Sequence, residues 1–225
     1  MKNSHGAVAF FLAVFVANAC DTGTCGAEEK PAKPEWKALF DGKTLKGWKK
    51  SDFFKPGEVT VKDGCMVLEK GDAMTGITYA GKDFPTTNYE VTLEGKRVTG
   101  QDFFCTTTFP VGKEFCSFVV GGWGGSTIGL SNINGADASE NLTNGSKVFK
   151  DDQFYRFRIR VTDTKINVWI DDEQVVDLKR KGFEFSIRIE CDESKPFGIA
   201  TWRTVGMVKN IKVRTLTAEE VKGDK

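Results

Sequence analysis

Histidine is almost absent from this sequence of 225 residues, and the only one is His5. His5 lies in an N-terminal segment with the pattern of a cleaved leader, so the domain that follows has no imidazole group. This absence excludes Ser-His-Asp and Cys-His catalysis and zinc sites with histidine ligands. Any acid–base chemistry must then depend on carboxylates, tyrosines, lysines or thiols.

An excess of charge of one sign is also absent. The chain has 32 Lys and Arg residues against 31 Asp and Glu residues. This balance provides no electrostatic footprint for a nucleic acid or an anionic membrane. The glycine-rich stretch 121–125 lacks the Lys-Ser/Thr pair of a phosphate-binding loop. The sequence therefore predicts no nucleic-acid partner.

Apolar runs of membrane-spanning length are absent as well. The run Ala7–Val16 would form a helix of ~15 Å, half of a ~30 Å hydrocarbon core, so we expect no transmembrane segment. Lys2 before this run and Ala17-Asn18-Ala19 after it are typical of an export signal. We expect a signal peptide at 1–19 and an exported protein that is periplasmic, extracellular or lipid-anchored to the cell envelope. Cys20 follows the cleavage site, and both ordinary cleavage and a lipid anchor at Cys20 stay open.

Alternating apolar and polar residues dominate the chain after this leader. Residues 20–35, rich in proline and charge, are expected to be a linker, residues 36–217 a β domain, and residues 218–225 a frayed polar tail. Tyr89, Val91 and Leu93 alternate with polar residues, and no long segment has the period of a helix. Asp63-Gly64 between two such runs predicts a tight hairpin. The pattern predicts an all-β sandwich of two antiparallel sheets.

One long segment interrupts this alternation and contains most of the candidate site residues. Glycines flank Trp123, and about fifteen residues without regular structure follow at 131–146, a length that is often functional. Asp137 and Glu140 are the candidate catalytic acids and the candidate ligands of a divalent metal such as calcium. Asn141, in the same loop, is a candidate substrate-binding residue. The alternative is a solvated hairpin loop with two ordinary acids, in which Trp123 covers the core.

Several residues outside this loop are further candidates. Asp102 is a third candidate catalytic acid, and Glu190 with Asp192 are similar strand-end acids. Trp123 and Trp202 could stack on sugar rings, although burial in the core is the commoner fate of such residues. The remaining candidate substrate-binding residues are Arg97, Gln101 and Arg203. Arg156, Arg158 and Arg160 line one face of a strand, where we expect pairing with acids on the neighbouring strand.

Cysteine pairing is left open by the sequence. Cys105 and Cys116 stand on either side of the predicted turn at 110–113 and are disulfide candidates if the register brings them together. Free buried thiols are the alternative, because cysteine packs as a small hydrophobic residue.

Segments at both ends of the domain resemble a known family. Residues 39–48, the turn at 61–64, residues 168–172 and the closing segments 197–200 and 208–213 are similar to the 3-keto-disaccharide hydrolase domain family. The resemblance implies a concanavalin A-like jelly-roll sandwich, a carbohydrate or glycoside ligand, and frequent export by bacteria. Asp102 falls where the family tends to read Gly-Asn-Ser-Gly, and Thr201-Trp202-Arg203 falls where it often carries Gln with a nearby His, so this chain departs from both motifs.

The resemblance also implies a reaction. In a glycoside oxidised at C3, the ketone acidifies the C2 proton, so a base can remove it and the C1 substituent then leaves, followed by addition of water. Asp137 or Glu140 would be the base or metal ligand, Arg97 or Arg203 would hold the enolate oxygen, and Trp123 would carry the sugar. The alternatives are a non-catalytic lectin-like or envelope module and a purely structural surface protein.

Overall fold

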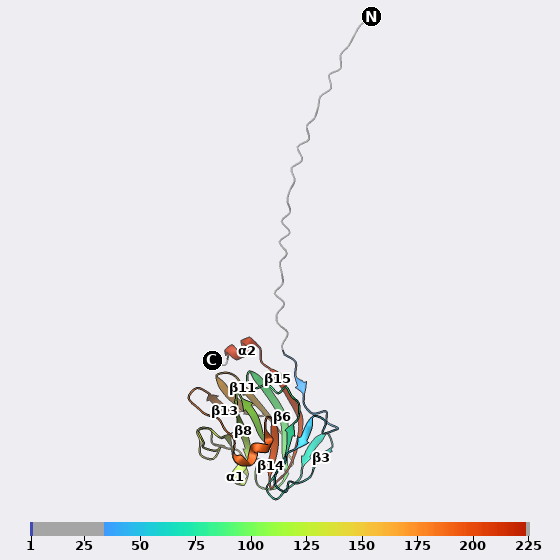
Figure 1. The fold of residues 1–225 in the computed structure, drawn as a ribbon, viewed down its shortest axis with the longest axis vertical. Coiled ribbons are helices and arrows are strands. Elements are labelled where there is room, and N and C mark those ends of the chain that lie inside the picture. The colour runs from blue at the N-terminus through green and yellow to red at the C-terminus, as the bar shows by residue number, and fades with distance from the viewer. Residues whose placement is uncertain (2–33, 224–225) are drawn as a thin grey trace. The chain divides into compact units, whose positions relative to one another are not determined.

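The structure is a computed structural model that describes Met1 and residues 34–223. The predicted signal peptide, Cys20 and nearly all of the predicted linker lie outside the described residues. The described residues from 34 onward belong to one compact unit (Figure 1). None of their helices is both long enough and apolar enough to cross a membrane.

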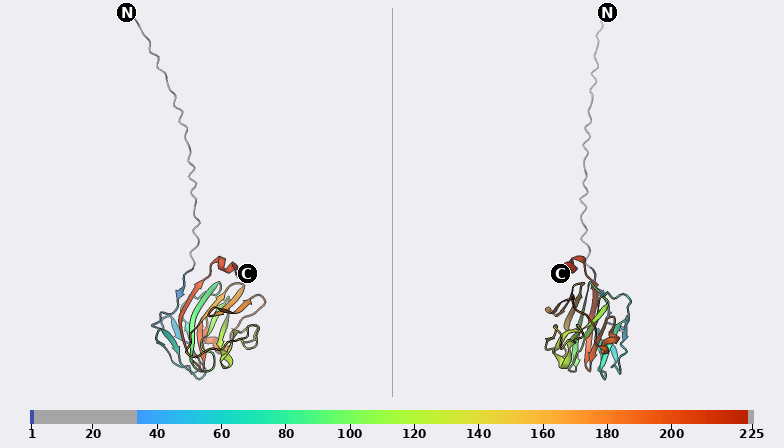
Figure 2. Two further views of the ribbon diagram at one scale, coloured as in Figure 1. Left: turned by 180° about the vertical axis from the view of Figure 1, so that it is seen from behind. Right: turned by 60° about the vertical axis from the view of Figure 1, so that its left-hand side comes forward.

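Two antiparallel sheets make up this unit, which confirms the predicted jelly-roll sandwich (Figures 1 and 2). The first sheet, called sheet A, has eight strands among the described residues: in order β13 (Glu173–Lys179), β12 (Lys165–Ile170), β11 (Tyr155–Val161), β6 (Tyr89–Thr99), β15 (Val205–Thr215), β4 (Cys65–Leu68) and β3 (Val59–Lys62), with β1 (Lys37–Ala38) paired to β15. The second, sheet B, has seven: β10 (Gly145–Ser146), β9 (Thr127–Ser131), β8 (Glu114–Gly121), β7 (Thr106–Val111), β14 (Gly198–Trp202), β5 (Met74–Tyr79) and β2 (Trp48–Lys50).

The inward-facing residues of the alternating strands form the core between the sheets. Those of β6 and β11 include Val91, Leu93, Phe157 and Ile159, which are at most 1% exposed. Fully buried side chains of sheet B pack in the same core, among them Phe109, Phe118, Leu130 and Ile199. Each such side chain contributes about 1.5–3 kcal/mol when it leaves water, so the period-two pattern fixes which face of each strand points inward.

The predicted hairpin is confirmed. Asp63 and Gly64 have φ values of 51° and 76°, and Lys62 is paired with Cys65 across the turn. Asp and Gly tolerate this left-handed region at low cost, which is why this dipeptide is a hairpin signal.

Two short helices complete the described residues, together with the segment labelled α1 (Gly122–Gly125). The 3-10 helix η1 (Ile189–Ser194) packs against β14 and β5 of sheet B. The helix α2 (Ala218–Gly223) occupies the expected frayed tail. Thr217 and Glu220 hydrogen-bond each other's backbone N–H groups at 3.1 and 3.0 Å, and Arg214 holds Glu220. This reciprocal capping arrangement explains why a polar tail is helical.

Candidate active site

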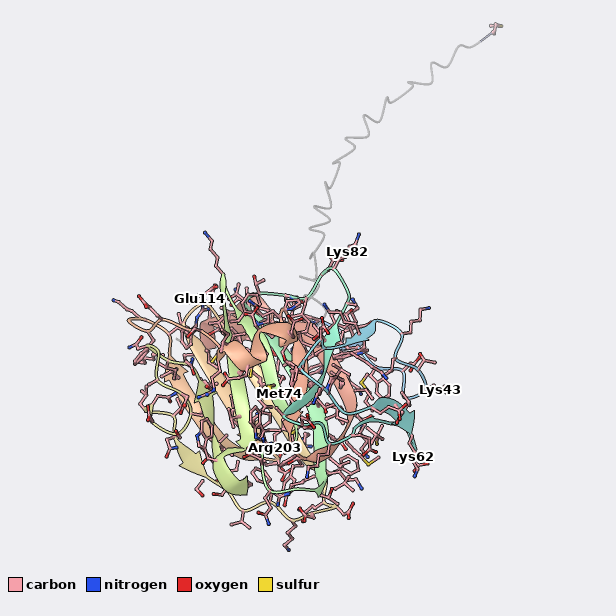
Figure 3. The ribbon with its side chains drawn as sticks, turned by 60° about the horizontal axis from the view of Figure 1, so that its bottom comes forward. Lys43, Lys62, Met74, Lys82, Glu114 and Arg203 are labelled. Carbon is pink, nitrogen blue, oxygen red and sulfur yellow. The ribbon has the colours of Figure 1, made fainter. Side chains whose placement is uncertain are left out.

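A cavity of about 240 Å³ opens on the outer face of sheet B, at the end of the sandwich where β6 and β8 finish. Its lining comes from the strands of sheet B, the β6–β7 connection, the segment after β8 and the segment that precedes β14: Met74, Asp102, Phe103, Thr106, Ser117, Val119, Trp123, Ser131, Arg188, Glu190, Cys191 and Trp202. Figure 3 labels Met74 and Arg203. The backbone N–H of Arg203 donates to the carbonyl of Ala73, the residue before Met74, at 2.8 Å.

The segment 183–196 covers much of this outer face. The hydroxyl of Thr78 on β5 donates to the carbonyl of Glu193 at 2.6 Å, which holds η1 against the sheet. Beneath the segment, a second apolar cluster unites Phe53, Met74, Cys191 and Ala200, with Phe103, Ile187 and Trp202 packed against it. Residues on the outer face of sheet B, which would face solvent in an open sheet, are therefore buried. The cavity is the part of this outer face that the segment leaves uncovered.

Asp102 and Glu190 are the candidate acids that line this cavity. Glu190 is bound by Arg188, whereas no described cation pairs with Asp102. Burial raises its pKa above the ordinary value, although backbone N–H groups of Phe103, Gly124 and Trp123 act in the opposite direction. The Phe103 N–H lies 2.8 Å from Oδ1. A carboxylate with a raised pKa that keeps its position through backbone contacts has the properties of a general base.

The turn that contains Trp123 and Gly124 provides two of those contacts, one from each backbone N–H group. Trp123 and Gly124 have φ values of 47° and 91°, so the segment labelled α1 is a left-handed turn rather than an α-helix. Successive N–H groups in such a turn converge on an anion, in this case Asp102. The Trp123 side chain is 45% exposed, so it lines the cavity instead of covering the core. Three of the flanking glycines, Gly121, Gly124 and Gly125, have positive φ, which glycine adopts without strain.

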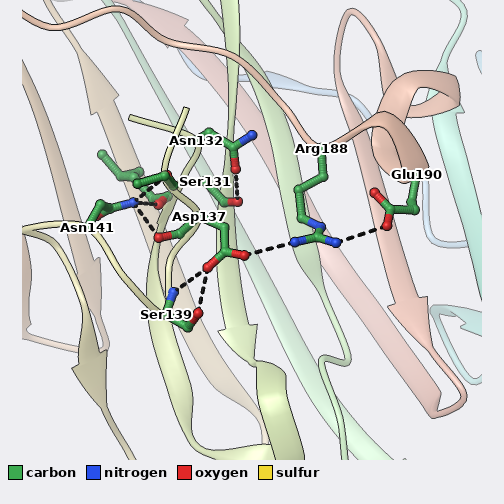
Figure 4. Close-up of polar contacts among 9 residues, drawn as sticks. Ser131, Asn132, Asp137, Ser139, Asn141, Arg188 and Glu190 are labelled. Atoms are coloured by element: carbon green, nitrogen blue, oxygen red, sulfur yellow. Dashed lines mark hydrogen bonds and ion pairs between the residues drawn. The ribbon is translucent and has the colours of Figure 1, made fainter. Parts of the chain in front are cut away.

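Arg188 connects the cavity to the long loop (Figure 4). One guanidinium nitrogen lies 2.8 Å from Oδ2 of Asp137, and the other lies 2.9 Å from Oε1 of Glu190. The pKa of Arg188 is raised, first through its hydrogen bond to Glu190, and the pKa of Glu190 is lowered by the same bond. The guanidinium therefore stays charged at the edge of the cavity, with N–H groups left for a ligand.

Asp137 has a structural role in the loop. Its Oδ1 accepts hydrogen bonds from the N–H and the hydroxyl of Ser139 at 2.9 and 2.6 Å, while Oδ2 binds Arg188. Burial acts to raise its pKa, but the bonds to Ser139 and the charge of Arg188 outweigh burial and lower it. Asp137 is thus an ionised anchor for Arg188 and a poor proton acceptor.

Asn141 organises the same loop from within (Figure 4). Its side-chain amide donates to the carbonyls of Leu130, Ala136 and Asp137 at 2.7–3.1 Å, and its oxygen accepts from Thr143. Only 9% of the residue is exposed. With these atoms engaged, Asn141 holds the loop together and does not face the cavity as a substrate-binding residue would.

Four other predicted site residues lie outside the cavity lining. Arg97 pairs with Asp151 and donates to the carbonyl of Phe149 at 2.9 Å. Arg203 donates to the carbonyl of Asp72 at 2.8 Å. Glu140 and Gln101 are exposed. Of the predicted residues, the structure brings Asp102, Trp123, Glu190 and Trp202 together in one cavity.

The disulfide candidates Cys105 and Cys116 are not paired, and the structure has the free buried thiols that were the alternative. Cys116 is opposite Phe109 in the β7–β8 pairing, and Cys105 precedes β7, so the two are not cross-strand neighbours. Both are fully buried free thiols, as are the buried Cys65 and Cys191 among the described residues. Burial raises the pKa of Cys116 to about 12 and that of Cys191 to about 11, which makes both poor nucleophiles.

The expected pairing with an acid on the neighbouring strand is confirmed for Arg160 and, at 4.0 Å, for Arg158, whereas Arg156 pairs with an acid in a turn. Arg160 on β11 is paired in register with Glu90 on β6, and their side chains form an ion pair at 2.7 Å. Arg156 pairs with Asp172 in the turn after β12 at 2.6 Å.

A divalent metal at Asp137 and Glu140 remains a prediction, and the contacts of Asp137 do not fit it. Both Asp137 oxygens are occupied by Ser139 and the cationic Arg188. Across the described residues, no group of three or more His, Cys, Asp and Glu is placed to hold a metal ion.

Arg188 is the functional residue that sequence reasoning missed. Residues 185–190 alternate as a strand would, which put Arg188 and Glu190 on one side of the chain, but nothing local shows that this segment crosses the face of sheet B. Backbone pairing between 132–134 and 184–186 fixes that path. The alternation of apolar and polar residues at 185–190 was the signal in the sequence that could have found Arg188. The path of this segment across sheet B depends on tertiary contacts, which the sequence pattern does not contain.

The family model of the 3-keto-alpha-glucoside-1,2-lyase-like domain matches residues 35–214. The chain belongs to this family. The resemblance of the opening and closing segments is therefore confirmed. In the structure the two segments are neighbours, since the N–H of Leu39 donates to the carbonyl of Ile211 in β15 at 2.9 Å. No curated protein matches the chain.

Solved structures similar to this 3-keto-alpha-glucoside-1,2-lyase-like domain include several carbohydrate-related proteins. Domain 4 of AbnA, an extracellular arabinanase from Geobacillus stearothermophilus, is 13% identical with a TM-score of 0.54, over 86% of this chain and 99% of that one. A carbohydrate-binding module from Bacillus subtilis is 11% identical with a TM-score of 0.50, over 75% and 96%. The Crh5 transglycosylase is 14% identical with a TM-score of 0.56, over 83% and 85%. At these identities the similarity shows the fold alone.

Proposed function

We propose that this carbohydrate-active domain removes the C2 proton of a 3-keto-glycoside with Asp102 as the base. The observation that carries the proposal is the Asp102 carboxylate in a cavity that two tryptophans also line, with its pKa raised by burial. A base must be ionised and yet hold a proton well enough to remove it from carbon, and a raised pKa favours the second requirement.

Arg188 supplies the second part of the chemistry. When the C2–H bond breaks, its electron pair moves toward the C3 carbonyl, and the enolate oxygen gains negative charge. The free N–H groups of Arg188 at the cavity edge would stabilise that charge, and Asp137 and Glu190 keep the guanidinium in place. The enolate then expels the C1 substituent, and a proton must reach the leaving oxygen. Protonated Asp102 is a donor within the same cavity.

The aromatic lining supports a sugar ring as the ligand. Trp123 and Trp202 present apolar surfaces to the cavity, and the C–H faces of pyranoses pack well on such rings. A volume of about 240 Å³ is small for a ligand site, so we infer one sugar ring as the part that enters.

The test is release of aglycone from a 3-keto-glucoside by the full chain and its variants. Asp102→Asn is expected to lower kcat by about 10²–10⁴-fold, as for loss of a general base, and Arg188→Gln is expected to lower it as well. Asp172→Asn, in an exposed turn far along the chain from the cavity, is the matched control and should retain activity. Full activity of Asp102→Asn would refute the assignment.

A carbohydrate-binding module without catalysis is the second candidate. The departures from the family motifs at Asp102 and at 201–203 favour it. In that case 3-keto-glucosides and their parent glucosides bind equally, no aglycone is released by any variant, and Trp123→Ala removes binding. We also propose that the protein is exported. Labelling with a lipid precursor in the native host distinguishes a lipid anchor at Cys20 from ordinary cleavage before it.

A further inference from the structure

A second cavity lies at the opposite end of β8, around the turns that join β7 to β8 and β11 to β12. It has a volume of about 500 Å³, within the usual range of ligand sites. It shares no lining residue with the cavity that contains Asp102. Its lining is Glu114, Asp163, Thr164, Lys165, Lys179, Arg180, Lys181, Phe183 and Phe185.

Arg180 is the central cation of this second cavity. Its guanidinium donates to the carbonyl of Thr162 at 2.5 Å, and its backbone N–H donates to the carbonyl of Thr164 at 2.8 Å. These contacts fix the guanidinium between the two turns. Among the described residues no ion pair neutralises Arg180, and burial lowers its pKa although Asp163 and Glu114 lie near enough to act against this effect. Arg180 is therefore a half-buried cation with no directly bonded carboxylate among the described residues, and a bound anion would be a favourable partner for it.

The flanking lysines increase this positive charge. Lys165 and Lys179 are directly opposite each other in the β12–β13 pairing, and like charges at such positions are destabilising. Asp177 offsets part of the repulsion through its ion pair with Lys165 at 3.3 Å. Lys179 and Lys181 are exposed at the cavity.

The two acids of the cavity are already engaged. Asp163 accepts hydrogen bonds from the side chains of Thr87 and Asn88 at 2.9 Å, and Glu114 accepts one from the backbone of Phe185 at 3.4 Å. Four cations and two acids therefore line the cavity, which leaves a net positive charge.

An apolar surface accompanies these charges. Phe185 is buried, while Phe183 is only partly buried and packs against the core. The cavity thus offers a planar cation for a carboxylate and an aromatic surface for the C–H face of a ring.

We propose that this second cavity binds an acidic sugar, with Arg180 holding the carboxylate of a uronic acid residue. The cavity lies apart from the catalytic site proposed above, so it would anchor the protein on an acidic glycan without taking part in the reaction. The proposal holds whether or not Asp102 is a base.

The test is an NMR titration of the full chain with sodium glucuronate and with glucose, which differ in the oxidation of C6. Glucuronate is expected to shift the backbone signals of 163–165 and 179–185, and glucose is not. Arg180→Gln should weaken binding at least about tenfold because a charge-assisted bidentate contact is lost. Lys179→Gln with Lys181→Gln should weaken it severalfold and reduce its salt dependence. Asp102→Asn should bind normally.

Arg156→Gln is the matched control, since Arg156 lies on β11 outside the cavity and should leave the affinity unchanged. The proposal is overturned if glucose binds as well as glucuronate, if inorganic sulfate binds as tightly as glucuronate, or if Arg180→Gln leaves the affinity intact. If Arg180→Gln fails to fold, the double lysine variant decides, because neither exposed side chain is needed to hold a turn.

Discussion

Asp102 and Glu90 are two carboxylates, both withdrawn from water, whose neighbours differ. Asp102 receives backbone N–H groups and no cation pairs with it among the described residues. Glu90 is 2% exposed and has three arginines around it, with Arg160 at 2.7 Å, Arg214 at 3.6 Å and Arg158 at 4.0 Å. The first arrangement fits the proposed role of Asp102 as a base, and the second makes Glu90 the centre of an ion-pair cluster.

The raised pKa of Asp102 predicts where activity is lost on acidification. The base works only when ionised, so kcat/KM should fall as the pH decreases through the pKa of Asp102 in the free protein. Burial places that pKa above the ordinary 3.8, so the acidic limb should lie at higher pH than for an exposed aspartate. A pH–rate profile measures it, and a midpoint at or below 3.8 would contradict the role of burial.

Glu90→Gln is expected to destabilise the fold by about 3–5 kcal/mol, because the buried carboxylate among these three arginines is replaced by a neutral amide. Urea unfolding measures the change. Glu94→Gln on the same strand is the matched control: Glu94 is 31% exposed in its side chain and lies 3.5 Å from Lys209, so its loss should cost less than about 1 kcal/mol. Equal effects of the two changes would be inconsistent with this account.

Among the structural elements, the loop between β9 and β10 is ordered by one side chain. The side-chain amide of Asn141 donates hydrogen bonds to three backbone carbonyls, and its oxygen accepts one from the N–H of Thr143. The loop has no regular secondary structure, but these bonds satisfy its backbone groups. The loop in turn positions Asp137, which holds Arg188. The order of the cavity edge therefore depends on a residue that does not line it.

Asn141→Ala is expected to lower stability by about 1–3 kcal/mol, since buried carbonyls lose their donors. It should also increase hydrogen exchange within 132–144 and weaken ligand binding through Arg188. Asn144→Ala, which removes a single bond to the carbonyl of Ala138, serves as the comparison and should have the smaller effect. Unchanged exchange in the loop of Asn141→Ala would show that other contacts hold it.

Considering the whole molecule, the four described cysteines contribute as packing side chains. Reductant is therefore expected to leave the Tm unchanged, and alkylation after denaturation without reductant should modify Cys65, Cys105, Cys116 and Cys191 in a peptide map. A fall in Tm with reductant, together with protection of Cys105 and Cys116, would restore the disulfide that the register argues against.

The sandwich could be predicted from the sequence because its determinants are local. Asp63-Gly64 specifies its hairpin, and the alternation of Phe157 and Ile159 with arginines specifies which face is buried. The candidate site was harder to predict from the sequence. Asp102 and Trp123 could be nominated as an acid and an exposed aromatic, but Arg188 reaches them only because 183–196 crosses sheet B. That path depends on contacts between distant segments, which no local pattern contains.

The pairing of Lys37 with Val213 has a further consequence. The polypeptide enters and leaves the sandwich at adjacent positions on one strand pair. A domain with this geometry can be carried as an insertion inside a larger protein, or rejoined through a short peptide and opened at a surface turn, without disturbing its layers.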